Sequence, residues 1–256
     1  MAKRRVLRPK KKVKKSQSNK KVILFLGLGF LFIILFLIYF FQVKEIQIRK
    51  KKNEFLKSIP SGFSSVGIDI SHHQGEMDWK KLFRKNAFDT LIHFVYCKAS
   101  EGITHVDREW KKNRVWLLKN NKNHGAYHFF LPDEDPLLQA KHFLSLWKKQ
   151  DGDLPPVLDI EIEAKDLKVL YKNMTVWLNE VEKISGMRPI IYTSLNFYEE
   201  KFHSTFMNYK FWIAAYSRKP DCINDDRILH WQFTENGIIP GTKEKVDINV
   251  SKIDFK

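Results

Sequence analysis

The sequence contains few cysteines, and its first 57 residues contain almost no acidic side chains. The two cysteines, Cys97 and Cys222, allow at most one disulfide, and two free thiols are equally compatible with the sequence. No internal repeat is present. Hydrophobic residues make up 43% of the 256 positions, which is enough to form a core and excludes a wholly disordered chain.

Net charge is also scarce over most of the chain, although the total is +16. Residues 1–57 contain 17 of the 45 lysines and arginines but only two of the 29 acidic residues, Glu45 and Glu54. Residues 58–256 therefore contain 28 basic and 27 acidic residues, a net charge of +1. A region so nearly neutral has little net charge with which to attract nucleic acid, and we predict no nucleic-acid partner.

The run without charged residues at 22–41 is predicted to be a transmembrane helix. Twenty helical residues rise by about 30 Å, which is the thickness of the hydrocarbon core of a bilayer. A buried helix of a soluble domain and a cleaved signal peptide are the alternatives. A signal peptide has a shorter apolar region followed by small residues, whereas this run ends in Tyr39, Phe40 and Phe41. We therefore expect an uncleaved anchor in the lipid bilayer.

The distribution of basic residues predicts how this anchor is oriented. Eleven lysines and arginines precede the span and six follow it up to Lys57, so the N-terminus is expected in the cytoplasm. The expected product is a single-pass protein of the cell membrane with its C-terminal part outside. We expect a basic tail (1–21), the span (22–41), a linker (42–61) and one domain (62–256), which we expect to be monomeric.

Strand-like and helical segments alternate in residues 62–256. The expected strands are 65–70, 91–99, 125–130, 157–162, 189–193, 211–216, 230–233 and 246–250, and the expected helices are 78–85, 107–120, 136–149 and 166–185. This alternation favours parallel βα units, and eight strands indicate a barrel closed on itself. The predicted fold class is α/β, an irregular eight-stranded TIM-like barrel. Its last units lack good helices, because 217–229 and 234–245 resemble loops.

The segment 157–163 (VLDIEIE) contains the densest group of acidic residues at an expected strand end. Side chains alternate along a strand, so Asp159, Glu161 and Glu163 share one face and aliphatic residues form the other. An edge strand with a solvated polar face fits less well, because the opposite face is aliphatic. Buried carboxyl groups raise one another's pKa, as a general acid in glycoside hydrolysis requires. We therefore hypothesise a glycosidase.

Two other kinds of site are compatible with these residues. His72, His73 and His128, near Asp69 and Asp159, would suit a metal-dependent polysaccharide deacetylase or amidohydrolase. No pair among these three histidines has the helical i, i+4 ligand spacing, so we predict no metal and no cofactor. The third hypothesis is a non-catalytic peptidoglycan-binding module that keeps the groove without turnover.

Seven motifs, in order, resemble those of glycoside hydrolase family 25, the Chalaropsis-type lysozymes. They are 67–75 (GIDISHHQG) with Asp78-Trp79, 98–102 (KASEG) with Asp107, 125–129 (GAYHF), 156–161 (PVLDIE), 191–193 (IYT), 231–233 (WQF) and 246–249 (VDIN). The resemblance covers essentially all of residues 66–250. It implies an eight-stranded irregular barrel that cleaves the β-1,4 bond between N-acetylmuramic acid and N-acetylglucosamine in peptidoglycan, whose glycan strands would be its partner.

The resemblance also implies roles for four acids. Glu161 matches the general acid/base, and Asp159 matches its carboxylate partner, which would orient the substrate 2-acetamido group or support positive charge. Asp69 and Asp247 match the other two active-site acids. Retention of the anomeric configuration is implied, with either an aspartate or the acetamido group attacking C1. His73 stands where many relatives have tryptophan, which puts one sugar-stacking contact in doubt.

Polar and aromatic residues at the strand ends are the candidates for binding substrate. They are Glu101, Tyr127, His128, Tyr192, Tyr216, Trp231 and Gln232. Aromatic rings provide platforms for sugars. We expect Trp79, Trp110, Trp147 and Trp177, at helical spacing, to pack in the core instead. Glu163 is expected one step beyond the strand end and is not predicted to be the acid. The resulting prediction is a membrane-anchored peptidoglycan hydrolase.

Overall fold

The computed structural model of the chain describes residues 18–84, 91–217 and 219–255. Two compact units are present, one up to Lys51 and one from Lys52 onward. Most of the expected basic tail (1–21) lies outside the described residues. Helix α1 (Ser18–Ser58) forms the described part of the first unit and ends in the second.

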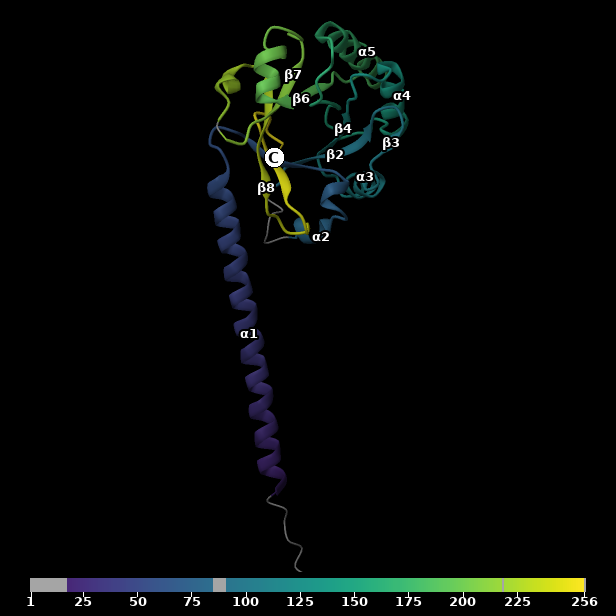
Figure 1. Ribbon diagram of the computed structural model, residues 1–256. Helices are drawn as coiled ribbons and strands as arrows, with labels where there is room; N and C mark the ends of the chain where they lie inside the picture. The colour runs from purple at the N-terminus through teal and green to yellow at the C-terminus, as the bar shows by residue number, and fades with distance from the viewer. Residues whose placement is uncertain (1–17, 85–90, 218, 256) are drawn as a thin grey trace, which may run out of the picture. The chain divides into compact units, whose positions relative to one another are not determined.

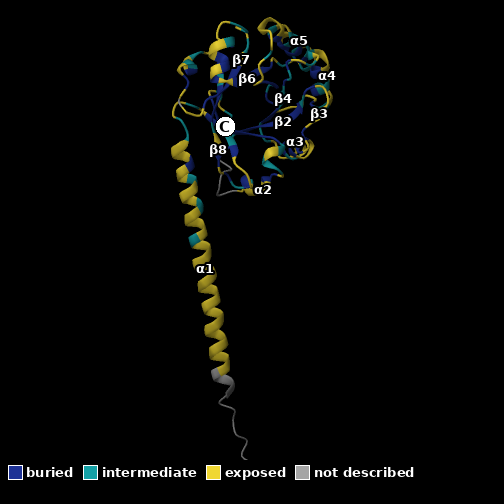
Figure 2. Cartoon of the chain, viewed as in Figure 1, coloured by how far each residue is buried: buried dark blue, intermediate teal, exposed yellow. Residues whose placement is uncertain are grey.

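Helix α1 contains the apolar run predicted to cross a membrane. An 18-residue window of Val22–Ser58 has a mean hydropathy of 3.0, and none of that window is buried (Figure 2). The helix is long and apolar enough to be a membrane anchor or a signal sequence. It continues to Ser58, so most of the expected linker (42–61) is helical. Lysine, glutamine, glutamate and arginine in this segment favour helix, and Pro60 stops it.

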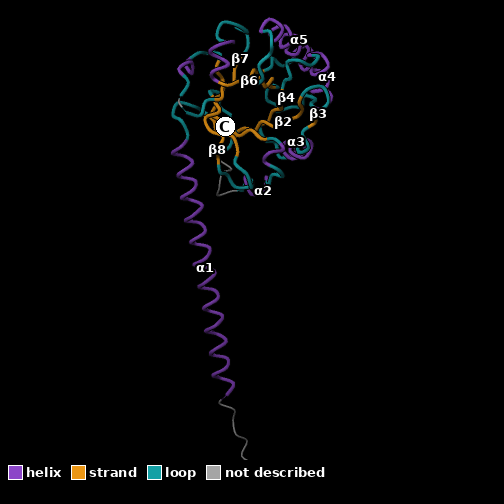
Figure 3. Tube along the Cα trace, in the orientation of Figure 1, coloured by secondary structure: helices purple, strands orange, loops and turns teal. Residues whose placement is uncertain are grey.

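Eight strands of the second unit close into a barrel (Figures 1 and 3), which confirms the predicted fold class. Their hydrogen-bonded order is β1 (Ser65–Ile70), β9 (Val246–Ser251), β8 (Ile228–Gly237), β7 (Lys210–Ala214), β6 (Ile190–Ser194), β5 (Val157–Ile160), β4 (His124–Phe129) and β2 (Phe94–Glu101). Strand β2 then pairs with β1 and closes the ring. The short strand β3 (His105–Val106), which was not predicted, pairs with β2 outside the ring.

Strand β9 departs from the prediction of parallel units. It runs antiparallel to both β8 and β1, whereas the other pairs in the ring are parallel. Residues 238–245, between β8 and β9, are too few for the crossover that parallel strands require. The N-terminal end of β9 therefore lies at the edge where the parallel strands have their carboxyl ends. The register places Asp247 opposite Asp69 across this ladder.

Helices lie outside the ring of strands (Figure 3). They are α2 (Trp79–Leu82), α3 (Trp110–Lys119), α4 (Pro136–Leu146), α5 (Leu167–Ser185) and the short α6 (Leu195–Phe197), with a π-helical turn η2 (Tyr198–Phe202) and 3₁₀ turns η1 (His72–Gln74) and η3 (Asp221–Asn224). Asp166 caps α5 at its start, and Gly186 ends it in the left-handed conformation. The expected helix 78–85 ends at Leu82 within the described residues, and Lys85 lies outside them. Expected loops 217–229 and 234–245 contain η3 and the end of β8.

Large aromatic side chains fill the inside of the barrel and the layer between strands and helices. Phe94, Tyr96 and Trp212 are buried within the ring. A β-carbon on Gly67 would overlap the Phe94 ring and one on Gly125 the Tyr96 ring, so both positions require glycine. The four tryptophans predicted to be core residues are buried: Trp79, Trp110, Trp147 and Trp177. Both cysteines are free thiols.

Candidate active site

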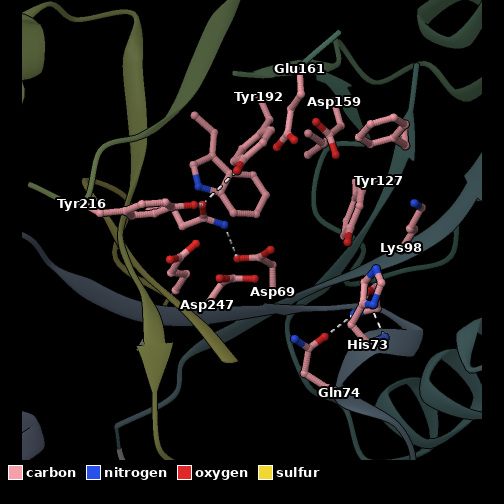
Figure 4. Close-up of a pocket in the computed structure, with 16 residues that line it drawn as sticks. Asp69, His73, Gln74, Lys98, Tyr127, Asp159, Glu161, Tyr192, Tyr216 and Asp247 are labelled. Carbon is pink, nitrogen blue, oxygen red and sulfur yellow. Dashed lines mark hydrogen bonds between the residues drawn. The ribbon is translucent and has the colours of Figure 1, made fainter. Parts of the chain in front are cut away.

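A cavity of about 270 Å³ opens at the edge where the parallel strands have their carboxyl ends (Figure 4). All four acids predicted to be catalytic line it: Asp69, Asp159, Glu161 and Asp247. Glu235 lines it as well, so five carboxyl groups share a small volume. Carboxylates held this close together repel one another, and the repulsion favours protonation of some of them.

Two strands that are far apart in the sequence position Asp69 and Asp247. They lie on β1 and β9, and the antiparallel register makes them direct neighbours across the ladder. Figure 4 shows their carboxyl groups on the same side of the cavity. This placement depends on the reversed direction of β9, because in a parallel strand Asp247 would lie at the opposite end of the barrel.

Strand β5 positions the other two acids. It ends at Ile160, two residues earlier than predicted, so Glu161 is the first residue beyond the strand. The ladder stops here because β4 ends at Phe129, which pairs with Asp159. Asp159 and Glu161 both point into the cavity (Figure 4). Glu163 does not line it: its side chain is 73% exposed and pairs with Lys201 at 2.6 Å.

Amide side chains hold Asp69 in place. Its Oδ1 accepts hydrogen bonds from Gln232 Nε2 at 2.9 Å and from Asn249 Nδ2 at 2.7 Å. Gln232 Oε1 accepts in turn from the hydroxyls of Tyr192 at 2.8 Å and Tyr216 at 2.5 Å. Because each amide orientation is fixed by its other partners, the network presents donors to Asp69.

Burial raises the pKa of both acids of β5. For Asp159 the pKa lies well above its ordinary value because of burial and the charge of Glu161. Asp159 Oδ1 is buried without a hydrogen-bond partner among the described residues. Burial also raises the pKa of Glu161, against the lowering effects of the Tyr192 hydroxyl and of Lys98. The two groups titrate together, so the pair holds a proton at a pH where an exposed carboxyl group does not.

Burial acts on the acids of β1 and β9 in the same direction. It raises the pKa of Asp69 to about 6, even though two amide hydrogen bonds favour the anion. Burial together with the charges of Asp69 and Glu235 raises the pKa of Asp247 to about 8. The cavity therefore contains protonated and ionised carboxyl groups side by side near neutral pH, as acid catalysis at a glycosidic oxygen requires.

Four of the predicted substrate-binding residues line the cavity: Tyr127, Tyr192, Tyr216 and Gln232. His128 does not. It is fully buried against the helical layer, where it contacts Ser100 Oγ at 2.8 Å and Gln139 Oε1 at 3.1 Å. Burial lowers the pKa of His128 to about 3. Alternation along β4 explains the difference, since Tyr127 faces inward and its neighbour must face outward.

Trp231 and Glu101 also lie outside the cavity. Trp231 is buried, and its Nε1 donates to the Ala215 carbonyl at 2.9 Å, while its neighbour Gln232 faces inward. Glu101, at the end of β2, accepts from Lys98 Nζ at 2.6 Å. These two residues and His128 therefore lie outside the central cavity, and their predicted contact with substrate stays a prediction.

Lys98 and Asn249 are among the cavity and network residues that the site prediction did not name, and strand alternation is the signal that would have found both. Lys98 lines the cavity from β2, on the face of that strand that carries Phe94 and Tyr96. Asn249, which donates to Asp69, lies two residues after Asp247 on β9.

The three histidines of the predicted alternative metal site do not form one group, because His128 lies apart from His72 and His73. His72 and His73 lie in η1 with ring centroids 4.1 Å apart, and His72 Nδ1 is 2.8 Å from Asp107 Oδ2. His128 faces the helical layer on β4. Over residues 18–84, 91–217 and 219–255, no three histidine, cysteine or acidic side chains are grouped so as to hold a metal ion.

Comparisons with known proteins agree with this geometry. The family model described as "Glycosyl hydrolases family 25" matches residues 68–242. The protein YegX of Escherichia coli (strain K12) is 35% identical over 199 residues, which are 77% of this chain and 72% of that protein. Lysozyme M1 of Streptomyces globisporus is 28% identical over 207 residues, 74% and 69% of the two chains. A solved family 25 glycosyl hydrolase from Bacillus anthracis aligns with a TM-score of 0.68 and 27% identity, covering 75% of this chain and 91% of the other.

Proposed function

The chain belongs to glycosyl hydrolase family 25, and from this we propose that its barrel hydrolyses the β-1,4 bond between N-acetylmuramic acid and N-acetylglucosamine in peptidoglycan. The enzyme is a glycosidase of the lysozyme type, an N-acetylmuramidase. One observation carries the proposal: Asp159 and Glu161 enter the cavity together, and burial raises the pKa of both. Such a pair supplies one proton donor and one anion to the same bond.

Glu161 is the general acid/base in the proposed mechanism. Burial raises its pKa, and in this mechanism its carboxyl group gives a proton to the departing glycosidic oxygen. The resulting carboxylate then takes a proton from the water that completes hydrolysis. The Tyr192 hydroxyl, which donates to Gln232 Oε1 in this structure, would stabilise that carboxylate by turning its proton toward Glu161, and such a hydrogen bond lowers the pKa of Glu161. An aspartate or the oxygen of the substrate 2-acetamido group bonds to C1 as the glycosidic bond breaks, and water then displaces it, so we expect the anomeric configuration to be retained.

Asp159 is the anionic partner. Its buried Oδ1 has no hydrogen-bond partner among the described residues, so it is available to accept from the N–H of the substrate 2-acetamido group. An anion in this position also stabilises the positive charge that develops at the anomeric carbon. Asp69, held by two amide donors, and Asp247 beside it complete the anionic surface.

Two further hollows adjoin the central cavity and support a polymeric substrate. One shares His73 and Gln74 with the cavity and extends to Arg108. The other shares Glu161 and Tyr216 with it. A glycan strand would pass from one hollow to the other with the cleaved bond at Glu161, and the tyrosine ring would stack on a sugar.

We further propose that α1 stays attached as a single-pass anchor with its N-terminus in the cytoplasm. The uncharged run 22–41 and the eleven basic residues before it, against six after it, support this orientation. The catalytic domain then lies outside the membrane, where peptidoglycan is found. The size of the protein in the membrane fraction shows whether the anchor is cleaved, and full length is expected. Protease added outside intact cells tests the orientation, and it is expected to digest the catalytic domain. A shortened, secreted protein would contradict the anchor.

The test of the activity uses the full-length protein in detergent with purified peptidoglycan. The wild type is expected to release new reducing ends in the presence of a chelator, and mass spectrometry is expected to place them on N-acetylmuramic acid. Glu161→Gln, which keeps the size of the side chain, is expected to lower this activity by at least about 10³-fold with an unchanged circular dichroism spectrum.

The other outcomes identify other functions. Reducing ends on N-acetylglucosamine would indicate a glucosaminidase. Release of acetate that a chelator abolishes would indicate a metal-dependent deacetylase. Binding to peptidoglycan without any product would indicate a non-catalytic module. Full activity in Glu161→Gln would contradict the mechanism.

A further inference from the structure

A single ammonium group lies among the acids of the central cavity. Of the described residues that line it, Lys98 is the only lysine or arginine, and it faces five carboxyl groups. Its side chain is 9% exposed. Figure 4 shows it beside Tyr127, on the same side of the cavity as His73. A buried ammonium is costly unless anions compensate it, so its charge acts strongly on the acids nearby.

The surroundings hold the Lys98 ammonium at one place. Nζ donates to Glu101 Oε2 at 2.6 Å and lies 4.7 Å from the centroid of the Phe129 ring. An ammonium has three donors, and Glu101 takes one of them. Glu101 is 33% exposed and does not line the central cavity. A residue outside the cavity therefore holds the ammonium in place, while Lys98 itself lines the cavity and its charge acts on the acids there.

The charge of Lys98 acts on the two acids of β5. It lowers the pKa of both Asp159 and Glu161, against burial, which raises them. The negative charge of Glu101 has the opposite effect and raises the pKa of Asp159. The pKa values of Asp69 and Asp247 are governed instead by burial and neighbouring acids, with amide hydrogen bonds acting on Asp69.

The other titratable groups around Lys98 do not compete with this effect near neutral pH. On β4 they are Tyr127, whose pKa burial raises well above its ordinary value, and His128, whose pKa burial lowers to about 3. Both stay uncharged. In η1 the group is His73, whose pKa is lowered from its ordinary value by burial and by the charges of His72 and Lys98. His73 is the one group that requires a control.

We propose that Lys98 is a positioning residue that keeps the Asp159–Glu161 pair in its singly protonated form, and that Glu101 tunes it by sharing its charge. The inference rests on the proposed function, in which one member of the pair must donate a proton while the other is an anion. Without the ammonium, both acids would remain protonated to a higher pH and the anion would be missing. Without Glu101, the pair would lose its last proton at a lower pH.

The experiment measures kcat/KM against pH for the full-length protein in detergent with soluble peptidoglycan fragments. Lys98→Met keeps the apolar stem and removes the charge, and it is expected to move both limbs of the profile upward by about one pH unit. Glu101→Gln is expected to move them downward. Lys98→Arg, which retains the charge, is expected to leave them near the wild-type positions. The Lys98→Met shift is expected to persist in a His73→Gln background.

The opposite directions distinguish positioning from a purely structural role. If Lys98 only stabilised the fold, Lys98→Met would lower the melting temperature and reduce activity at every pH without moving the limbs, and this result would overturn the inference. If Lys98→Met does not fold, Glu101→Gln, at a partly exposed position, still tests the inference. A pH profile of kcat/KM that does not move, or that moves upward, in Glu101→Gln would overturn the inference. A wild type that releases no reducing ends at any pH would instead refute the proposed function.

Discussion

Two pairs of carboxyl groups meet in the cavity, and they differ in how they are held. Asp159 and Glu161 are two residues apart at the end of β5, and Asp159 keeps an unpartnered buried oxygen. Asp69 and Asp247 are 178 positions apart, and the antiparallel ladder brings them together. Amide donors fix Asp69, whereas Lys98 acts on the β5 pair. We therefore propose different roles for the two pairs: in the β5 pair Glu161 transfers the proton beside the anion of Asp159, and the β1–β9 pair shapes and charges the site.

The largest expected effect separates the two pairs by activity. Asp159→Asn is expected to lower kcat by about 10²–10³-fold, because it removes the anion that faces the developing positive charge. Asp247→Asn is the matched variant on the other pair, and a loss of only about tenfold is expected. Steady-state kinetics on peptidoglycan measure both. Equal losses in the two variants would remove the distinction between the pairs.

The next effect concerns the amide that fixes Asp69. Asn249 is fully buried, donates to Asp69 and accepts from Trp212 Nε1 at 2.8 Å. Asn249→Ala leaves the buried Trp212 Nε1 without its acceptor and removes one of the two donors to Asp69, and it is expected to lower the free energy of unfolding by about 2–4 kcal/mol. Urea unfolding followed by fluorescence measures this. Asn236→Ala, at an exposed site, is the control. If the two variants lose equally little free energy of unfolding, the hydrogen-bond network around Asp69 does not stabilise the barrel.

The raised pKa of Asp247, in the β1–β9 pair, predicts how the stability of the protein depends on pH. Its pKa is raised to about 8 in the folded protein, so the folded state binds more protons than the unfolded state between about pH 4 and 8. Stability from this group is present at low pH and is lost as the pH rises through that window. Asp247→Asn removes the loss and is expected to be about 1–2 kcal/mol more stable than the wild type at pH 8.5.

Thermal unfolding at pH 4.5 and pH 8.5 checks this sign. The advantage of Asp247→Asn is expected to shrink toward zero at the lower pH, because the wild-type group is then protonated in the folded state. The expected gain in the free energy of unfolding is modest for two reasons. Asp247 is partly exposed, and part of the rise in its pKa comes from the charge of Asp69. A variant that is less stable than the wild type at pH 8.5 would contradict the raised pKa.

The smallest effect is expected at Glu163. This residue is as close to Glu161 in the sequence as Asp159 is, but it is exposed and paired with Lys201. Glu163→Gln is expected to keep activity within about twofold and stability within about 0.5 kcal/mol of the wild type. A large loss of activity would mean that closeness in sequence, rather than access to the cavity, defines the acid.

Strand alternation explains which of the predicted site residues line the cavity and which do not. It correctly separates Asp159 from its aliphatic neighbours, and it excludes His128 and Trp231 once Tyr127 and Gln232 are known to face inward. The prediction named both members of these adjacent pairs, although a strand can present only one of them to each face. Lys98 and Asn249 follow from the same rule applied at i, i+2.

Several features of the chain depend on residues that are close in the sequence, and the sequence therefore determined them. They are the apolar run of α1, the imbalance of charge around it, the eight strands and the β5 acid pair, because length, composition and period-two alternation act locally. Other features depend on contacts between distant segments. The reversed direction of β9, the meeting of Asp69 with Asp247 and the raised pKa values exist only when the ring closes. Pairing and burial are properties of the assembled barrel, and only the tertiary structure could decide them.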